Sequence, residues 1–154
     1  MKDVSLDDID RRILSELAGD GRISFAELGR RTSLSAPAVT ERVRRLEQSG
    51  VITGYRAEID WRAIGYPLTA IVRIKPAVRQ LSKVAELAAE IPQIEECLRI
   101  TGEDCFYVKL HLGSIEELPG ILDRFLLYGE TTTSIVNATP VARRDPPIAD
   151  GLTR

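Results

Sequence analysis

Arginine side chains are concentrated between residues 22 and 45 of this sequence. Six arginines stand there against two acids, Glu27 and Glu41, whereas the whole chain has a formal net charge of −2. The six are Arg22, Arg30, Arg31, Arg42, Arg44 and Arg45. Guanidinium groups stay charged at neutral pH and donate hydrogen bonds in a geometry that suits phosphate, so this local basic surface can contact nucleic acid while the rest of the protein stays acidic. An ordinary charged surface in water is the alternative.

The residues around these arginines predict a helix-turn-helix at residues 23–50. Its second helix would carry basic side chains on its outward face. Ser24 and Glu27 have the spacing of a capping box at the start of a first helix. Ser35 can cap a second helix with Pro37 in its first turn, where a missing N–H costs little. The second helix of such a motif fits the major groove of DNA. Two ordinary packed helices are the alternative.

The predicted second helix has an apolar and a polar face. At about 100° per residue, Val39, Val43 and Leu46 form one stripe that must face the core. Arg42 lies near the edge of that stripe, so we expect it to bond locally rather than point outward. The polar face, the helix start and an arginine before the first helix supply the residues expected to contact DNA: Arg22, Ser35, Ala36, Pro37, Thr40, Glu41, Arg44 and Arg45.

Changes of periodicity divide the rest of the chain. A further helix, capped by Ser5 with Asp8 three residues later, is expected to complete a three-helix domain. Residues 51–60 are strand-like, and Gly65-Tyr66-Pro67 marks a boundary by its turn residues. The expected divisions are a helix-turn-helix domain of winged type at residues 1–52, a strand linker at 53–66, a second domain at 67–142 and a surface tail at 143–154.

Strand and helix periods alternate in the second half. We expect strands at residues 68–75, 94–101, 106–112 and 131–141, and helices at residues 81–91 and from about 119 to 126. The order β-α-β-β-α-β is that of a ferredoxin-like unit, so the fold class is α+β.

Both helices should cover one face of the predicted antiparallel sheet. The other face is expected to carry Ile71, Cys97, Tyr107 and Ile135, which is apolar enough to need a cover. A second copy of the sheet is the simplest cover, and it gives a two-fold dimer whose paired helices suit a palindromic site.

No pattern in the sequence indicates catalysis, a metal site or a membrane span. The one histidine, His111, lies in mid-strand without a serine or cysteine motif, and two cysteines are too few for a disulfide framework. No Cys/His cluster has zinc spacing, no run of about 18 apolar residues occurs, and the charged N-terminus lacks the apolar segment of a secretory signal. We therefore expect a cytoplasmic protein that is not an enzyme and has no metal or cofactor.

Two long stretches resemble the Lrp/AsnC transcriptional regulators, also called feast/famine regulators. The first, which is similar to their N-terminal half, is LDDIDRRILSELAGDGRISFAELGRRTSLSAPAVTERVRRLEQSGVITGYRAEID. The second half is similar in topology to their effector-sensing domain, the RAM domain, and shares the segments ITGEDCFYVKL and TTTSIV. The resemblance extends from Leu6 to about Val141.

The resemblance implies a regulator that binds double-stranded DNA and senses an amino acid or a related small metabolite. It implies homodimers that pair through the βαββαβ domains and often assemble to octamers, with the effector between dimers near the loop joining the second and third strands. Backbone N–H groups at a glycine turn can hold a carboxylate, and an acidic side chain can hold an ammonium group. The effector-binding residues implied are Leu98, Thr101, Gly102, Glu103, Asp104, Cys105, Thr133, Ser134, Ile135 and Val136.

Cys105 departs from the family pattern, because many relatives have an acidic residue there, and Glu103 and Asp104 could supply the charge instead. An acidic turn without a ligand is the alternative for this loop. For the whole chain, the alternative is a ligand-independent architectural DNA-binding protein.

Overall fold

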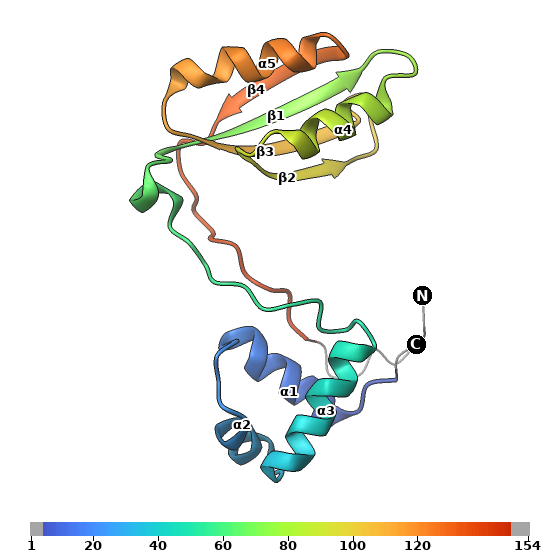
Figure 1. Cartoon of the computed structure of the whole chain (residues 1–154), viewed down its shortest axis with the longest axis vertical. Helices are drawn as coiled ribbons and strands as arrows, with labels where there is room; N and C mark the ends of the chain where they lie inside the picture. The colour runs from blue at the N-terminus through green and yellow to red at the C-terminus, as the bar shows by residue number, and fades with distance from the viewer. Residues whose placement is uncertain (1–4, 149–154) are drawn as a thin grey trace. The chain divides into compact units, whose positions relative to one another are not determined.

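The computed structural model describes residues 5–148, which fall into two compact units (Figure 1). The first unit consists of Met1–Glu58 and Ala142–Arg154, and the second of Ile59–Val141. Within the described residues, the first contains three α-helices and the second a four-stranded sheet with two α-helices, so the α+β fold class is confirmed. The finer division into a linker at residues 53–66 and a tail at 143–154 stays a prediction. Residues 1–4 and 149–154 of the expected first domain and tail lie outside the described residues.

The helices of the first unit are α1 (Asp8–Gly19), α2 (Phe25–Thr32) and α3 (Ala36–Gln48). Ser24 and Ser35 cap α2 and α3 as predicted, each accepting a hydrogen bond from the backbone N–H three residues later. The cap predicted for α1 is wrong, because Asp7 and Asp10 form the capping box instead of Ser5 and Asp8. The same three-residue spacing occurs twice in this acidic stretch, so spacing alone did not single out the right pair.

A tight turn joins α2 to α3. Ser33 lies in the left-handed region with φ 59°, and the N–H of Leu34 donates to the carbonyl of Gly29 at 2.8 Å. A Cβ on Gly29 would stand 2.6 Å from the carbonyl oxygen of Leu34, so the turn requires a glycine where it folds back on α2. The predicted apolar stripe of α3 is confirmed, since the core of this unit consists of Ile13, Ile23, Leu28, Val39, Val43 and Leu46.

The strand expected after α3 is not formed. Val51 and Ile52 donate their N–H groups to the carbonyl of Leu46, and residues 53–60 continue without a strand partner among the described residues. Trp61–Ile64 then form a short 3₁₀ helix, η1. A β-strand needs a neighbouring strand to satisfy its backbone groups, and an alternating pattern alone cannot supply one. The described residues of the first unit therefore contain no wing strand.

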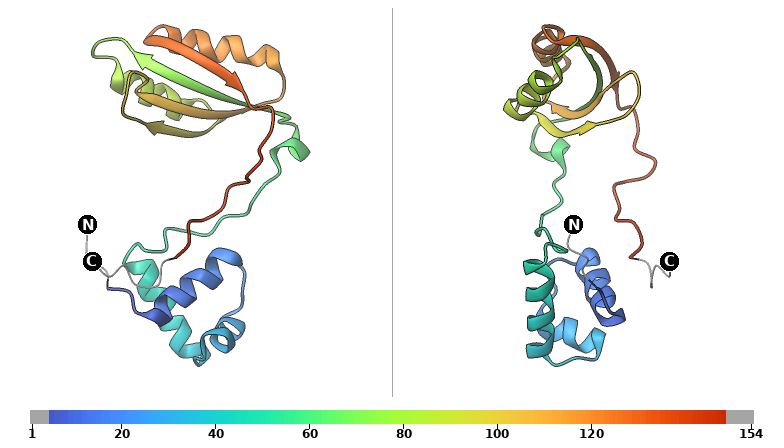
Figure 2. Two further views of the ribbon diagram at one scale, coloured as in Figure 1. Left: turned by 180° about the vertical axis from the view of Figure 1, so that it is seen from behind. Right: turned by 90° about the vertical axis from the view of Figure 1, so that its right-hand side faces the viewer.

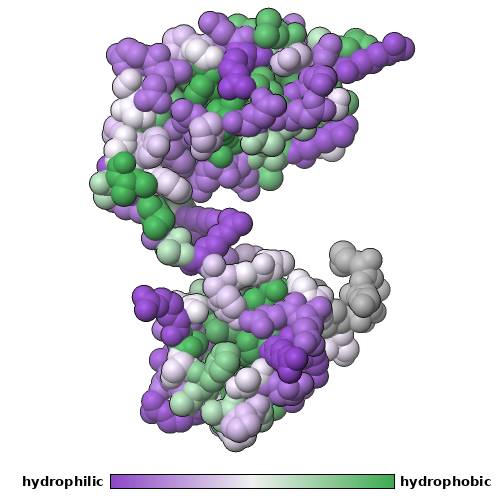
Figure 3. Space-filling model, in the orientation of Figure 1, coloured by the Kyte–Doolittle hydropathy of each residue, from purple (hydrophilic) through white to green (hydrophobic). Residues whose placement is uncertain are grey.

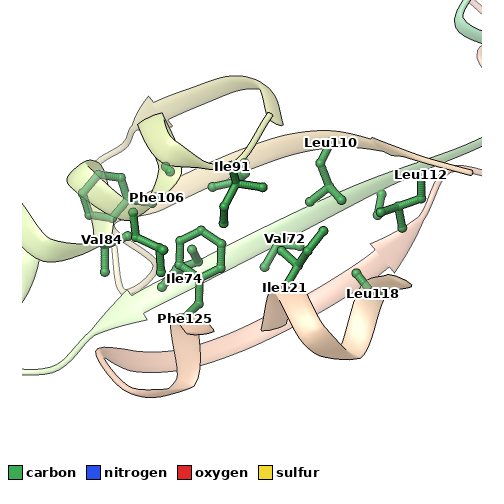
Figure 4. Close-up of a cluster of buried hydrophobic side chains, with 14 residues drawn as sticks. Val72, Ile74, Val84, Ile91, Phe106, Leu110, Leu112, Leu118, Ile121 and Phe125 are labelled. Atoms are coloured by element: carbon green, nitrogen blue, oxygen red, sulfur yellow. The ribbon is translucent and has the colours of Figure 1, made fainter. Parts of the chain in front are cut away.

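The second unit has the predicted order of two βαβ-type halves. Its elements are β1 (Leu68–Pro76), α4 (Leu81–Glu90), β2 (Ile94–Arg99), β3 (Phe106–Leu112), η2 (Ile115–Glu117), α5 (Leu118–Leu126) and β4 (Gly129–Ile135). The strand order is β2-β3-β1-β4, and all neighbours are antiparallel. Both α-helices cover one face of the sheet (Figure 2), and alternate side chains of β1 and β3 pack against them in a single core (Figure 4).

Two strands end earlier than predicted. β4 ends at Ile135 because β1 begins at Leu68, and the last bond between them joins the N–H of Val136 to the carbonyl of Thr69 at 2.9 Å. β2 ends at Arg99, and the N–H of Ile100 donates to the carbonyl of Cys105 at 2.9 Å where the chain turns. The residue types could not reveal either limit, because each depends on the partner strand.

The sheet face opposite α4 and α5, called the open face below, carries Ile71 and Tyr107 as expected. Cys97 does not lie there, because it stands opposite the buried Val108 and packs against the core. A β-bulge in β2 explains this error, since one extra residue reverses the alternation of side chains between the two faces.

Ile135 is also absent from the open face. It stands opposite the buried Ala70 at the end of β4, so it lies on the side covered by the helices. β4 is mainly threonine and serine, so its sequence has no apolar alternation from which the two faces could be distinguished.

Candidate functional site

The polar face of α3 is exposed, together with the start of the helix. The exposed residues there are Ser35, Ala36, Pro37, Thr40, Glu41, Arg44 and Arg45. The hydroxyl of Thr40 donates to the carbonyl of Ala36 at 2.9 Å, so its oxygen stays available as an acceptor. Arg22 is exposed in the turn before α2, and its N–H donates to the carboxylate of Asp20 at 2.9 Å. Seven of the eight residues predicted to contact DNA thus share one helix and its cap.

Two arginines of α3 are bound to the start of α1. The Nη1 atom of Arg42 lies 2.7 Å from an oxygen of Asp7 and 2.8 Å from an oxygen of Asp10. The Nη2 atom of Arg45 lies 2.5 Å from the other oxygen of Asp10. The prediction that Arg42 bonds locally is confirmed. Arg45 was expected to contact DNA, and the sequence did not reveal its ion pair with Asp10.

The arginines of α2 are paired as well. Arg31 lies 2.7 Å from Glu16 and 2.8 Å from Glu27, and Arg30 also pairs with Glu27. Among the described residues, Arg22 and Arg44 are therefore the two arginines of this segment that have no ion-pair partner. A count of arginines along the sequence overstated the unpaired positive charge, because three of the acids that pair with them, Asp7, Asp10 and Glu16, lie earlier in the chain on α1 and its N-cap.

The carboxylates at the start of α1 differ in their surroundings. Asp10 is fully buried, whereas the side chain of Asp7 is half exposed. A hydrogen bond from the backbone of Asp10 and another from the side chain of Arg42 hold the pKa of Asp7 below 3.8. The charged form of Asp7, which holds the guanidinium group of Arg42, is therefore favoured.

Residues 100–105 form the loop between β2 and β3 in which an effector site was expected. Gly102 has φ 118°, a conformation that favours glycine. Asp104 lies 3.2 Å from the guanidinium of Arg73 on β1, whereas Glu103 is exposed. Cys105 packs against the core. Asp104, the acid that precedes Cys105, is thus already paired with a cation of the same chain. Glu103 is the exposed carboxylate of the turn.

The two groups of residues expected to bind an effector lie apart within one chain. The loop joins β2 to β3 at the end of the sheet where Ile74 stands opposite Phe106, whereas Ile135 of β4 stands opposite Ala70, four residues earlier on β1. In the strand order β2-β3-β1-β4, β1 separates β4 from β3. Thr133 faces the covered side, where its hydroxyl oxygen is buried without a hydrogen-bond partner. Leu98 lies on the open face opposite Tyr107 and is 44% exposed. The structure therefore brings together residues of the loop, and separately residues of β4, but not both.

His111 is held in place on the open face. Its Nδ1 lies 3.1 Å from the hydroxyl of Thr69 and its Nε2 lies 2.9 Å from the carboxylate of Glu95. Trp61 stacks on the imidazole with 5.4 Å between ring centroids, and only 8% of the histidine is exposed. Both ring nitrogens are engaged, so the imidazole is fixed by its neighbours Thr69, Glu95 and Trp61.

Glu95 also binds the ammonium group of Lys109 at 2.8 Å. Burial raises the pKa of this carboxyl, but hydrogen bonds from Lys109 and His111 outweigh it and leave the pKa below 4.5. An ionised carboxylate therefore joins the side chains of β2 and β3.

Further apolar side chains are exposed around η1, as the hydrophobic surface in Figure 3 shows. They are Ile59, Trp61, Ile64 and Tyr66, each at least 36% exposed. In the part of the chain that the structure describes, no group of three His, Cys, Asp or Glu residues is arranged to hold a metal ion. No helix within residues 5–148 is long and apolar enough to cross a membrane.

Comparison with protein families gives two matches along the chain. Residues 6–53 match a family described as winged helix-turn-helix DNA-binding, and residues 69–146 match the Lrp/AsnC ligand binding domain. The first match covers α1, α2 and α3, and the second begins in β1 and extends beyond β4.

Several relatives are similar along most of their length. The transcriptional regulator LrpC of Bacillus subtilis is 36% identical, over 86% of this chain and 92% of the relative. The regulator LrpA of Mycobacterium tuberculosis is 40% identical, over 78% of this chain and 81% of the relative. Both are transcriptional regulators rather than enzymes, in agreement with the expectation from the sequence.

Solved structures of relatives have the same arrangement of elements. The structure of B. subtilis LrpC has a TM-score of 0.85 at 34% identity, covering 91% of this chain and all of that chain. A feast or famine regulatory protein of M. tuberculosis, solved as a complex with L-methionine, has a TM-score of 0.87 at 36% identity, covering 93% and 99% of the two chains. Fold, sequence and both family matches agree, and the chain belongs to the Lrp/AsnC family of transcriptional regulators.

Proposed function

We propose that this protein is a sequence-specific DNA-binding regulator whose DNA binding or assembly changes when an amino acid or a related metabolite binds to its second unit. The observation that carries the first part is the exposed polar face of α3, on which Arg44 stands without an ion-pair partner among the described residues. An arginine in this position can donate two hydrogen bonds to a guanine edge in the major groove. Such a regulator would act on DNA in the cytoplasm.

Replacing Arg44 tests this docking of α3. Arg44→Ala is expected to weaken binding to the preferred site by about 1–3 kcal/mol, because base contacts are lost, and to weaken binding to random-sequence DNA much less. Arg12→Ala is the matched control, since it removes the same charge from an exposed position on α1. Electrophoretic mobility shifts with a site selected from a random library give both affinities. Equal losses for the two variants would contradict the docking.

Arg22 has a different expected role, because it is exposed before α2 and can reach a phosphate. Arg22→Ala should weaken binding to all sequences alike and flatten the dependence of affinity on salt by about one unit of slope.

The sensing function is proposed from the second unit. It matches a ligand-binding domain, and one relative was solved as a complex with L-methionine. Gly102 places backbone N–H groups in a turn beside the exposed Glu103, a pairing that suits the carboxylate and ammonium groups of an amino acid. Because the loop and β4 groups lie apart in one chain, we propose that neighbouring subunits complete the site. This is consistent with a homodimer, paired through the open face, that assembles further.

A thermal-shift series with L-methionine and other amino acids at millimolar concentration tests sensing. A bound effector is expected to raise the melting temperature or change the sedimentation of the protein, and Glu103→Ala should reduce that response. If no amino acid has either effect while DNA binding persists, the architectural DNA-binding alternative is the better description.

A further inference from the structure

A buried carboxylate binds two arginines of the DNA-facing helix. Asp10 has no exposed surface, and its two oxygens accept hydrogen bonds from Arg42 and Arg45 at 2.8 and 2.5 Å. The side chain of Arg45 nevertheless keeps 56% of its surface exposed. The guanidinium therefore lies on the surface of the unit with one edge tied to the protein.

This arrangement determines how much positive charge α3 can offer to DNA. An arginine that neutralises a phosphate releases a counterion, and this release tightens binding to any sequence. An arginine already paired with a buried carboxylate gains less, because contact with phosphate must compete with the existing charge-assisted bonds. Arg44, which has no such partner among the described residues, is free to form contacts that depend on the base sequence.

We propose that Asp10 is a specificity-determining residue for DNA binding: by holding Arg45, with Arg42 beside it, the carboxylate limits binding to random sequences and leaves recognition to the outward side chains of α3. Asp10 acts through the arginines and touches no DNA itself. The inference rests on the proposed function of α3 in DNA binding.

The decisive variant is Asp10→Asn, which keeps the shape of the side chain and removes its charge. The amide oxygen can still accept one bond, so Arg45 is released without leaving a buried charge. Binding to a random-sequence duplex is expected to tighten roughly fivefold at 0.1 M salt, with the salt slope steeper by about 0.9. At the selected site the base contacts of α3 fix the position of the helix in the groove, so the released Arg45 cannot shift towards the nearest phosphate as it can on a random duplex. Affinity for the selected site should therefore change less, and the ratio of the two affinities falls.

Asp8→Asn is the matched control. Asp8 lies on the same helix, is exposed and has no ion-pair partner within the described residues, so its replacement makes the same change in net charge without releasing an arginine. If this control tightens random-sequence binding as much as Asp10→Asn does, net charge alone explains the effect and the proposal is wrong.

A double variant identifies the arginine responsible. With Arg45→Ala already present, Asp10→Asn should no longer tighten random-sequence binding. If it still does so by the full factor, Arg45 is not the group that Asp10 restrains, and the proposal fails. If Asp10 had only a structural role, Asp10→Asn would lower the melting temperature but leave the ratio of selected-site to random-sequence affinity at the wild-type value.

Arg45→Ala provides the test if Asp10→Asn does not fold, because the Arg45 side chain is 56% exposed and Asp10 keeps its bond to Arg42. Since Asp10 already holds the guanidinium of Arg45, removing it should leave the affinity for a random duplex and the salt slope nearly unchanged, whereas Arg22→Ala flattens the slope by about one unit. An equal flattening by Arg45→Ala overturns the proposal. Failure of the proposed function is distinct, since the wild-type protein would then select no site at all.

Discussion

Asp7 has two roles at the start of α1: it caps the helix and pairs with Arg42. Bonds from the Asp10 backbone and from Arg42 favour its charged form, so its pKa lies below the ordinary 3.8 in the folded protein. A carboxyl whose pKa is lower when folded adds stability above the unfolded pKa, and this stability disappears as the pH falls through the folded pKa.

We therefore expect Asp7→Asn to reduce the free energy of unfolding at pH 6, with the difference from wild type shrinking as the pH falls below 3.8. Asparagine retains the cap, so the variant isolates the charge. Urea unfolding followed by far-ultraviolet circular dichroism at several pH values measures the difference. A gap that stays constant down to the lowest pH at which the protein folds would contradict this assignment.

The residues facing outward from α3 could be predicted, because periodicity within one helix is a local property. The acids that bind Arg42 and Arg45 could not, because they lie more than thirty residues earlier and meet the arginines only when α1 packs on α3. Arg44 and Arg45 therefore look equivalent along the sequence and differ in the folded protein.

The helices and the βαββαβ order follow from the sequence, whereas the limits of each strand, and the sheet face to which its side chains point, depend on the neighbouring strand. The bulge in β2 places Cys97 on the covered face, and residues 53–60 have no strand partner within the described part of the chain. Both errors arise because the hydrogen bonds of a β-sheet join two segments, and the sequence of one segment does not reveal how the other pairs with it. Caps and tight turns are more local, and Ser24, Ser35 and the turn after Gly29 illustrate this.

The turn between α2 and α3 gives a prediction for Gly29. Gly29→Ala is expected to destabilise the first unit by about 1–3 kcal/mol, because its Cβ would meet the backbone oxygen of Leu34. Gly19→Ala is the control, since no atom lies within 4 Å of a Cβ there and alanine favours a helix. Denaturant unfolding compares them, and an equally stable Gly29→Ala protein would show that the turn can relax.

For the whole molecule, the open face is the surface from which we predict assembly. Ile71 lies at its centre, opposite Lys109 on one side and Ser134 on the other. Ile71→Glu should convert a dimer into a monomer, because it places a charge where two sheets would meet.

Leu127→Glu is the control, since Leu127 is 75% exposed at the end of α5. Sedimentation equilibrium without DNA or effector distinguishes the two species. A dimer that survives Ile71→Glu, or one that Leu127→Glu disrupts, would place the contact elsewhere.

Trp61, the single tryptophan of the chain, stacks on His111 inside the second unit. Its fluorescence emission therefore reports the melting of that unit alone, while ellipticity at 222 nm is dominated by helices of both. Recording the two signals from one sample during heating shows whether the helices of the first unit and the sheet of the second unfold in one transition. Coincident curves are expected if the two units unfold cooperatively.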